Sequence, residues 1–154
     1  MARFVFRLAP VLRQRERIEE QKKLLLAREQ RVLADAEARR EMLRNKRESL
    51  ARELIVEHRN LDFEGLRLAY AHLDFLAREI TAADWHVAAC QQAVDRAREV
   101  LVRASKDRKI LDRLQEHQRD AFKREELRLE QRELDDDNAR RYSRSSQSAR
   151  HHGV

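Results

Sequence analysis

The fold is decided by the stretch LDFLAREITAADWHVAACQQAVDRAREVLVRASKDRKIL, residues 73–111. Large apolar residues recur there every seven positions, and mostly small ones recur three positions later. The two ladders are Leu73, Ile80, Val87, Val94 and Leu101, and then Leu76, Ala83, Cys90, Ala97, Ala104 and Leu111. Alternating steps of three and four predict a helix in a left-handed coiled coil. Because one ladder is large and the other mostly small, large side chains of a facing helix can fit against it.

A second long helix is expected upstream, from about residue 10 to 58. Pro10 suits the first turn of a helix, where its missing N–H costs nothing. A ladder of Val11, Ile18, Leu25 and Val32 continues after a four-residue step as Ala36, Leu43 and Leu50, and Leu12, Leu26, Leu33 and Leu54 widen its flank. Charged residues hold the complementary positions, so a thin seam is predicted, with long polar stems partly covering it.

The best candidate for the turn between the helices is RNLDFEG, residues 59–65, in which Asn60, Asp62 and Gly65 tolerate turn conformations. Folding the chain back near residue 62 places Ala36 near Val87 and apolar residues opposite apolar residues throughout. A turn at Thr81–Asp84, where T-x-x-D resembles a capping box, is the alternative, but it would interrupt the best heptad run. The prediction is an all-α fold, a long antiparallel two-helix coiled-coil hairpin.

The expected domain is a hairpin over residues 1–137, with helices at about 10–58 and 66–137 and a turn at about 59–65. The segment NARRYSRSSQSARHHGV, residues 138–154, is polar and rich in Ser and Arg. It predicts a disordered C-terminal tail, because such a composition cannot bury enough apolar surface to order the chain.

Composition supports long helices with few connections. Charged residues make up 40% of the chain and aromatic residues 5%, with two Gly and one Pro, which leaves few places to turn. The net charge is +6, concentrated in the first 60 residues, but the two signs are interspersed there. This pattern is typical of a solvated coiled-coil surface, although a basic coiled coil that binds nucleic acid is an alternative.

No motif for catalysis or for cofactor binding is present. Two Gly cannot form a phosphate-binding loop, and neither H-E-x-x-H nor C-x-x-C occurs. We therefore expect no enzyme, no cofactor, no metal site and no small-molecule substrate. Cys90 is the only cysteine and lies on the seam ladder, where it is expected as a small buried apolar residue. Without a disulfide or a long apolar run, the protein is expected to be soluble and cytoplasmic.

Exposed apolar residues predict protein partners. Trp85 lies off both ladders, so it is expected to face outward as an interface anchor, unless it packs over the flank of its own coiled coil. Phe63, Leu66, Tyr70 and Phe75 cluster near the turn, where they either close the tip of the hairpin or form a docking patch.

Two segments carry a resemblance to a known family. They are FVFRLAPVLRQRERIEEQKKLLLA, residues 4–27, and KDRKILDRLQEHQRDAFKREELRLEQRELDDDNARR, residues 106–141. Both resemble the terminal regions of the FliJ family of flagellar export proteins. The FVFRL start favours this family over the equivalent stalk protein of a virulence-type III secretion system, which is an alternative.

The resemblance implies a stalk-like cytoplasmic component of the flagellar type III export apparatus, associated peripherally with the inner membrane at the flagellar base. Its partners would be the hexameric export ATPase, a membrane protein of the export gate, and export chaperones. The ATPase ring would be met by the paired ends of the hairpin, through Phe4, Phe6, Leu8, Val11, Leu12, Phe122, Leu127, Leu129 and Leu134. The gate would be met by Phe63, Leu66, Tyr70, Phe75 and Trp85. No contact with nucleic acid is expected.

Overall fold

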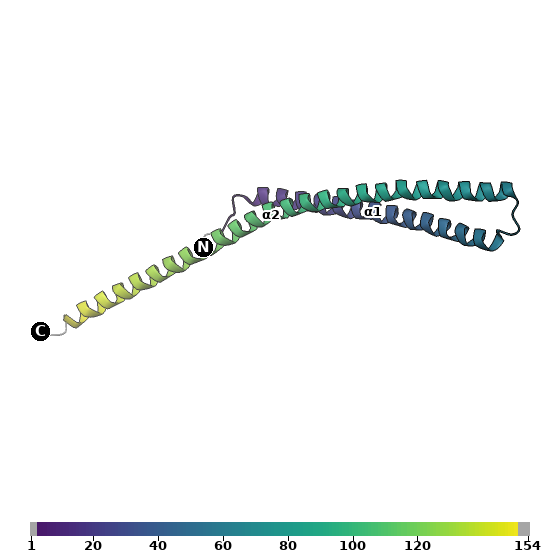
Figure 1. Ribbon diagram of the computed structural model, residues 1–154. Coiled ribbons are helices and arrows are strands. Elements are labelled where there is room, and N and C mark those ends of the chain that lie inside the picture. Colours follow the sequence, from purple (N-terminus) through teal and green to yellow (C-terminus); the bar gives the residue numbers. More distant parts are fainter. Residues whose placement is uncertain (1–2, 151–154) are drawn as a thin grey trace. The chain divides into compact units, whose positions relative to one another are not determined.

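The computed structural model describes the backbone of residues 3–150, which contain two long helices and no strand. Helix α1 spans Ala9–Glu57 and α2 spans Phe63–Arg150 (Figure 1). The predicted all-α hairpin is thereby confirmed. The chain divides into a hairpin unit, Arg15–Lys106, and a terminal unit, whose described residues are 3–14 and 107–150.

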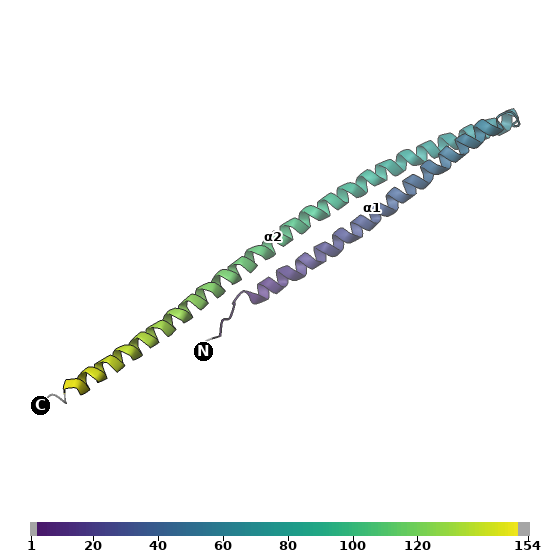
Figure 2. The same ribbon diagram turned by 90° about the horizontal axis from the view of Figure 1, so that it is seen from below.

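In the hairpin unit the two helices run antiparallel and side by side (Figures 1 and 2). Ala36 of α1 packs with Val87 and Cys90 of α2, which confirms the pairing expected from folding back near residue 62. A polar contact joins the same helices one turn away. Asp84 accepts a hydrogen bond from Arg44 (3.1 Å) and lies 3.6 Å from an Arg40 nitrogen. The seam is therefore fixed by small apolar side chains and flanked by an ion-paired carboxylate.

The seam ladders of α2 are those predicted from residues 73–111. Leu76, Val87, Cys90, Val94, Ala97 and Ala104 are buried, and the remaining members within the hairpin unit are half-buried. Even Val94, the most buried of them, keeps 2% of its surface exposed, because two helices alone cannot enclose a side chain from all sides. Because apolar residues alternate there at spacings of three and four positions, the sequence alone predicted this half of the seam.

On α1 the predicted ladder was wrong in part. Leu25 and Val32 are exposed, whereas Leu26 and Leu33 are half-buried and Leu54 is buried. The residues that the sequence places on the flank thus face α2. The physical reason lies in what α2 presents. Leu33 packs against the cluster of Ala36, Val87 and Cys90, so this face of α1 fits the small side chains of the facing helix.

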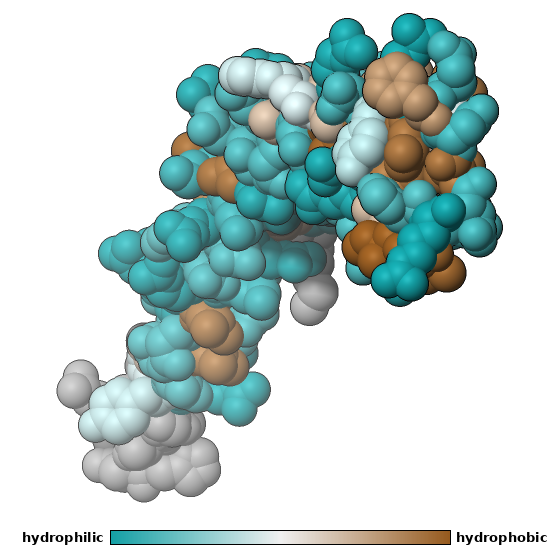
Figure 3. Space-filling model, turned by 45° about the vertical axis from the view of Figure 1, so that its right-hand side comes forward, coloured by the Kyte–Doolittle hydropathy of each residue, from teal (hydrophilic) through white to brown (hydrophobic). Residues whose placement is uncertain are grey.

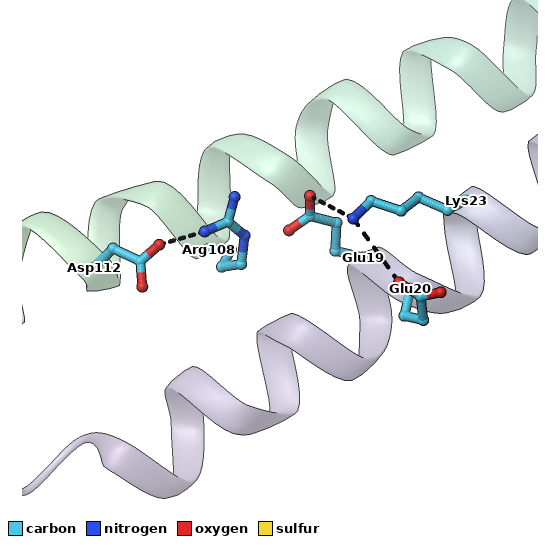
Figure 4. A network of polar contacts seen from close by, with 5 residues as sticks. All are labelled: Glu19, Glu20, Lys23, Arg108 and Asp112. Atoms are coloured by element: carbon cyan, nitrogen blue, oxygen red, sulfur yellow. Dashed lines mark hydrogen bonds and ion pairs between the residues drawn. The ribbon is translucent and has the colours of Figure 1, made fainter.

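Polar residues also occupy seam positions of α1. Glu19 is 6% exposed, although it lies where an apolar side chain would be expected, and Lys22 and Glu29 are half-buried. Glu19 and Glu20 both approach the Lys23 ammonium, at 3.6 and 3.8 Å (Figure 4). The seam is therefore thin near residue 20, as the sequence predicted for α1 generally.

The turn occupies residues 58–62, and α2 begins at Phe63, earlier than the expected residue 66. Asp62 caps the helix, because its Oδ1 accepts a hydrogen bond from the Gly65 N–H at 2.8 Å. Gly65 lies within the first helical turn and not in the loop. A Cβ there would stand 2.9 Å from Asp62 Oδ1, so the missing side chain leaves room for the cap.

The alternative turn at Thr81–Asp84 is wrong, because α2 continues through it without a break. Thr81 is a mid-helix residue whose hydroxyl donates to the Ala77 carbonyl at 3.0 Å. T-x-x-D therefore caps nothing here, and Asp84 instead contacts α1 across the hairpin.

Helix α2 runs on to Arg150, beyond the expected end near residue 137. No Pro or Gly occurs between Gly65 and Gly153, so nothing in the sequence breaks the helix. Every described side chain from Leu127 to Arg144 is exposed. Whether residues 138–150 are disordered in solution is a separate prediction that stands untested, and residues 151–154 lie outside the described part of the chain.

Replacing Asp62 with Ala is expected to lower the free energy of unfolding by about 1 kcal/mol, because the first turn of α2 loses its side-chain cap. Urea unfolding followed by circular dichroism measures the change. Asp62→Asn keeps an acceptor oxygen and should lose much less. Equal losses in both variants would show that the carboxylate acts through its charge and not as a cap.

Candidate partner-binding surfaces

Of the five predicted N-terminal contacts, two are buried, two are exposed, and Phe4 is half-buried. Phe6 and Leu12 are 6% and 7% exposed, so they belong to the core of the terminal unit. The Phe6 carbonyl accepts a hydrogen bond from the Ala9 N–H at 3.1 Å, which turns the chain into α1. Leu8 and Val11 remain 37% and 43% exposed. Only this second pair offers a surface to a partner.

Phe4 and Phe122 bring the two sequence segments of the terminal unit together. Their ring centroids are 5.7 Å apart and their planes are tilted by 51°. This distance and tilt fall in the favourable range for aromatic pairs, which avoid face-to-face stacking. The predicted neighbourhood of the N-terminal and C-terminal aromatic residues is thus present, as a contact within the chain.

The remaining predicted residues on α2 are open. Leu127, Leu129 and Leu134 are 65%, 49% and 59% exposed. Leu127 and Leu134 are seven residues apart and therefore share a helix face, whereas Leu129 points elsewhere. Val5, 73% exposed, was missed by the sequence reasoning. Its signal was the alternation Phe4-Val5-Phe6 in an extended segment, which turns the middle side chain away from the other two.

Polar pairs along α2 support its exposed part. Gln131 donates to Asp135 at 2.9 Å, and Arg128 lies 3.7 Å from Glu125. Pairs at three- and four-residue spacing each stabilise a helix by about 0.2–0.5 kcal/mol. They help a helix without a packing partner to stay formed, and they leave its leucines uncovered.

The predicted tip residues do not form one patch. Phe63, Tyr70, Phe75 and Trp85 are exposed, and Leu66 is half-buried on the seam side. Phe63 and Tyr70 share a face, but Phe75 lies five residues beyond Tyr70, about 140° around the helix. Trp85 does not pack over the flank of the hairpin, since it is 75% exposed. Figure 3 shows brown apolar side chains scattered among teal polar ones.

Within the part of the chain that the structure describes, no group of three or more His, Cys, Asp or Glu side chains is placed to hold a metal ion. No described helix has a stretch long and apolar enough to cross a lipid bilayer. Cys90 is buried, with its Sγ 3.8 Å from His86 Nε2. The surfaces that remain are apolar and charged faces of helices.

Comparison with known proteins gives one family match. The family described as "Flagellar FliJ protein" matches residues 4–147. A search of curated proteins finds no match. Among solved structures, a putative YscO homologue from Chlamydia trachomatis is similar, at 21% sequence identity and a TM-score of 0.47. That similarity covers 96% of this chain and 99% of the other.

Proposed function

This chain belongs to the FliJ family of flagellar proteins, and on that premise we propose that it is a stalk-like export component that binds the hexameric flagellar export ATPase. It acts by contact and not by catalysis. The resemblance found at residues 4–27 and 106–141 is confirmed, since the family match includes both segments. A role in type III export follows from the family, and the ATPase contact is the finer proposal.

The observation that carries the ATPase contact is the uncovered apolar surface of α2 after Glu126. Side chains from Leu127 to Arg144 are all exposed, and Leu127 and Leu134 stand on one face. Exposed leucines on a polar helix gain free energy only when a partner removes them from water. The contact between Phe4 and Phe122 holds the N-terminal segment to α2 nearby, within the same unit. Leu8 and Val11 add to the surface available to the ring.

The export gate is the second partner that we propose. Trp85 and Phe63 are the most exposed aromatic residues among the predicted tip contacts, at 75% and 79%. Exposed aromatic side chains are the usual anchors of protein interfaces. Contact with a membrane protein would place the chain at the cytoplasmic face of the inner membrane, where export chaperones could also reach it.

A binding role on nucleic acid is less well supported. Several basic side chains already face acidic neighbours, as in the pairs Lys23–Glu20 and Arg52–Glu48. Such pairs reduce the positive potential that phosphates would meet. The stalk of a virulence-type secretion system would use the same surfaces, but the matching family is a flagellar one.

The proposal is tested by the turnover of the purified cognate flagellar export ATPase with and without the full chain. We expect saturable stimulation together with co-elution of the two proteins. An unrelated helical hairpin of similar charge controls for crowding and ionic effects. If the folded chain neither bound the ATPase nor changed its turnover, the ATPase would be removed from the list of partners.

A further inference from the structure

A groove runs along one flank of the hairpin unit. Four hollows follow one another there, each lined by both α1 and α2. Three of them form one continuous depression, because neighbouring hollows share Glu79, and then Leu50, Glu53 and His72. The fourth is separate and follows one heptad on along α1, from Val32 to Leu25. We name the four hollows together the flank groove, and its apolar walls are Leu25, Val32, Met42, Leu68, Phe75 and Val100.

The flank groove explains why α1 carries more apolar residues than its seam uses. Leu25 and Val32, expected in the seam, lie on the groove wall and are 38% and 41% exposed. Leu68 and Phe75 of α2, also exposed, repeat the seven-residue spacing in the hollows nearer the turn. An exposed apolar pair at heptad spacing thus stands on each helix, one toward each end of the groove, and such pairs are what a third helix packs against.

The groove is acidic, although the chain as a whole carries a net charge of +6. Its lining includes six carboxylates, Glu29, Asp35, Glu41, Glu53, Glu57 and Glu79, against three cations, Arg39, Lys46 and Arg96. The hollow nearest the turn has Glu53 and Glu57 and no Lys or Arg in its lining. Opposite charges at the rim of a groove favour and orient a complementary partner.

We propose that the flank groove binds an amphipathic helix of a partner protein, with an apolar heptad face bordered by Lys and Arg. This inference does not rest on the ATPase contact, which uses the terminal unit. A second copy of the chain is the weaker occupant. Its uncovered segment, Leu127–Arg144, carries five acidic and five basic residues and so lacks the complementary charge.

The test uses the full chain and two synthetic peptides of about four heptads. Both have Leu and Ala on the apolar face, and the bordering positions are Lys in one and Glu in the other. Fluorescence anisotropy of the labelled peptides measures binding. The Lys peptide should bind at least about tenfold more tightly than the Glu peptide, with an affinity that falls as salt rises.

Two double variants assign the site. Met42→Lys with Phe75→Lys places like charge in the groove and should weaken binding of the Lys peptide at least about tenfold. Ile55→Lys with Val102→Lys makes the same charge change at exposed positions outside the hollows, one on each helix, and should leave binding almost unchanged. Glu53→Gln with Glu57→Gln, at exposed positions, should weaken binding and reduce its salt dependence without disturbing the fold.

Each outcome decides the proposal. Equal losses in both lysine variants, or equal binding of the two peptides, would remove the groove as the site of recognition. Absence of binding to the wild-type chain would do the same. Should sedimentation show a dimer that only Met42→Lys with Phe75→Lys disrupts, and no peptide binding, the occupant would be a second copy and the partner assignment would be wrong.

Discussion

Replacing Leu127 and Leu134 together with Glu is expected to weaken stimulation of the export ATPase at least about tenfold while leaving the fold intact. Both side chains are exposed, so their loss removes surface for a partner and no packing within the chain. Glu is nearly as good a helix former as Leu, and changes at such positions shift stability by about 0.5 kcal/mol or less. ATPase turnover as a function of chain concentration gives the shift in apparent affinity.

The matched control for that variant is Ile55→Glu with Val102→Glu. These apolar residues are also exposed but belong to the hairpin unit and not to the terminal unit. The control should stimulate like the wild-type chain at equal ionic strength. Equal loss of stimulation in both variants would mean that net charge, and not the leucine face, governs the contact. Phe6→Ala would be a poor probe, because Phe6 is buried and its loss mixes folding with binding.

Replacing Val94 with Asp is expected to lower the free energy of unfolding by about 3–5 kcal/mol, a large part of what holds a small domain together. Val94 is 2% exposed and lies at the centre of the seam. The new carboxylate would replace an apolar side chain that is almost fully buried. Glu29, half-buried on α1, lines the same hollow as the neighbouring Ala93 and Ala97, so it adds like-charge repulsion.

Urea unfolding at neutral pH measures this loss, and Val102→Asp is the control. Val102 is the same residue type on the same helix but 47% exposed, so its substitution should change stability by about 0.5 kcal/mol or less. Stability of Val94→Asp should partly recover at low pH, when the buried carboxyl is neutral. A Val94→Asp chain as stable as the control would show that the seam contributes little to the fold.

The sequence predicted the seam unevenly on the two helices, for a physical reason. On α2 only one pair of ladders is apolar over residues 73–111, so only one helix face can be buried. On α1 two apolar ladders lie one residue apart, beginning at Val11 and at Leu12. Either face could be buried in isolation, and the choice depends on what α2 presents. The burial of Glu19 could not be predicted from the sequence either, because a carboxylate interrupts the apolar periodicity that marks seam positions.

The residues of the candidate surfaces were predicted from their apolar or aromatic type, because the sequence does not show which of them are exposed. Leu127 and Leu134 lie past the region where α1 can cover α2, and the irregular spacing of their segment already suggested an open surface. Phe6 and Leu12 were grouped with them because a short apolar segment can be either core or contact. Only the structure separates the two, since it places Phe4 against Phe122 and buries Phe6 and Leu12 where the chain turns into α1.

The paired arginines at Asp84 have a consequence for how the hairpin chooses among its possible alignments. A coiled coil with a thin, repetitive seam can slip by one heptad at modest loss of apolar contact, lengthening or shortening the loop to suit. In the observed alignment Asp84 meets Arg40 and Arg44. Slipping one way would bring it to Leu33 and Glu37, and slipping the other way to Arg47 and Ala51. Each exposed ion pair stabilises the hairpin only a little. The first slip, however, would place Asp84 beside the like-charged Glu37, and the second would leave it with one arginine in place of two. One carboxylate thus discriminates against both misaligned hairpins.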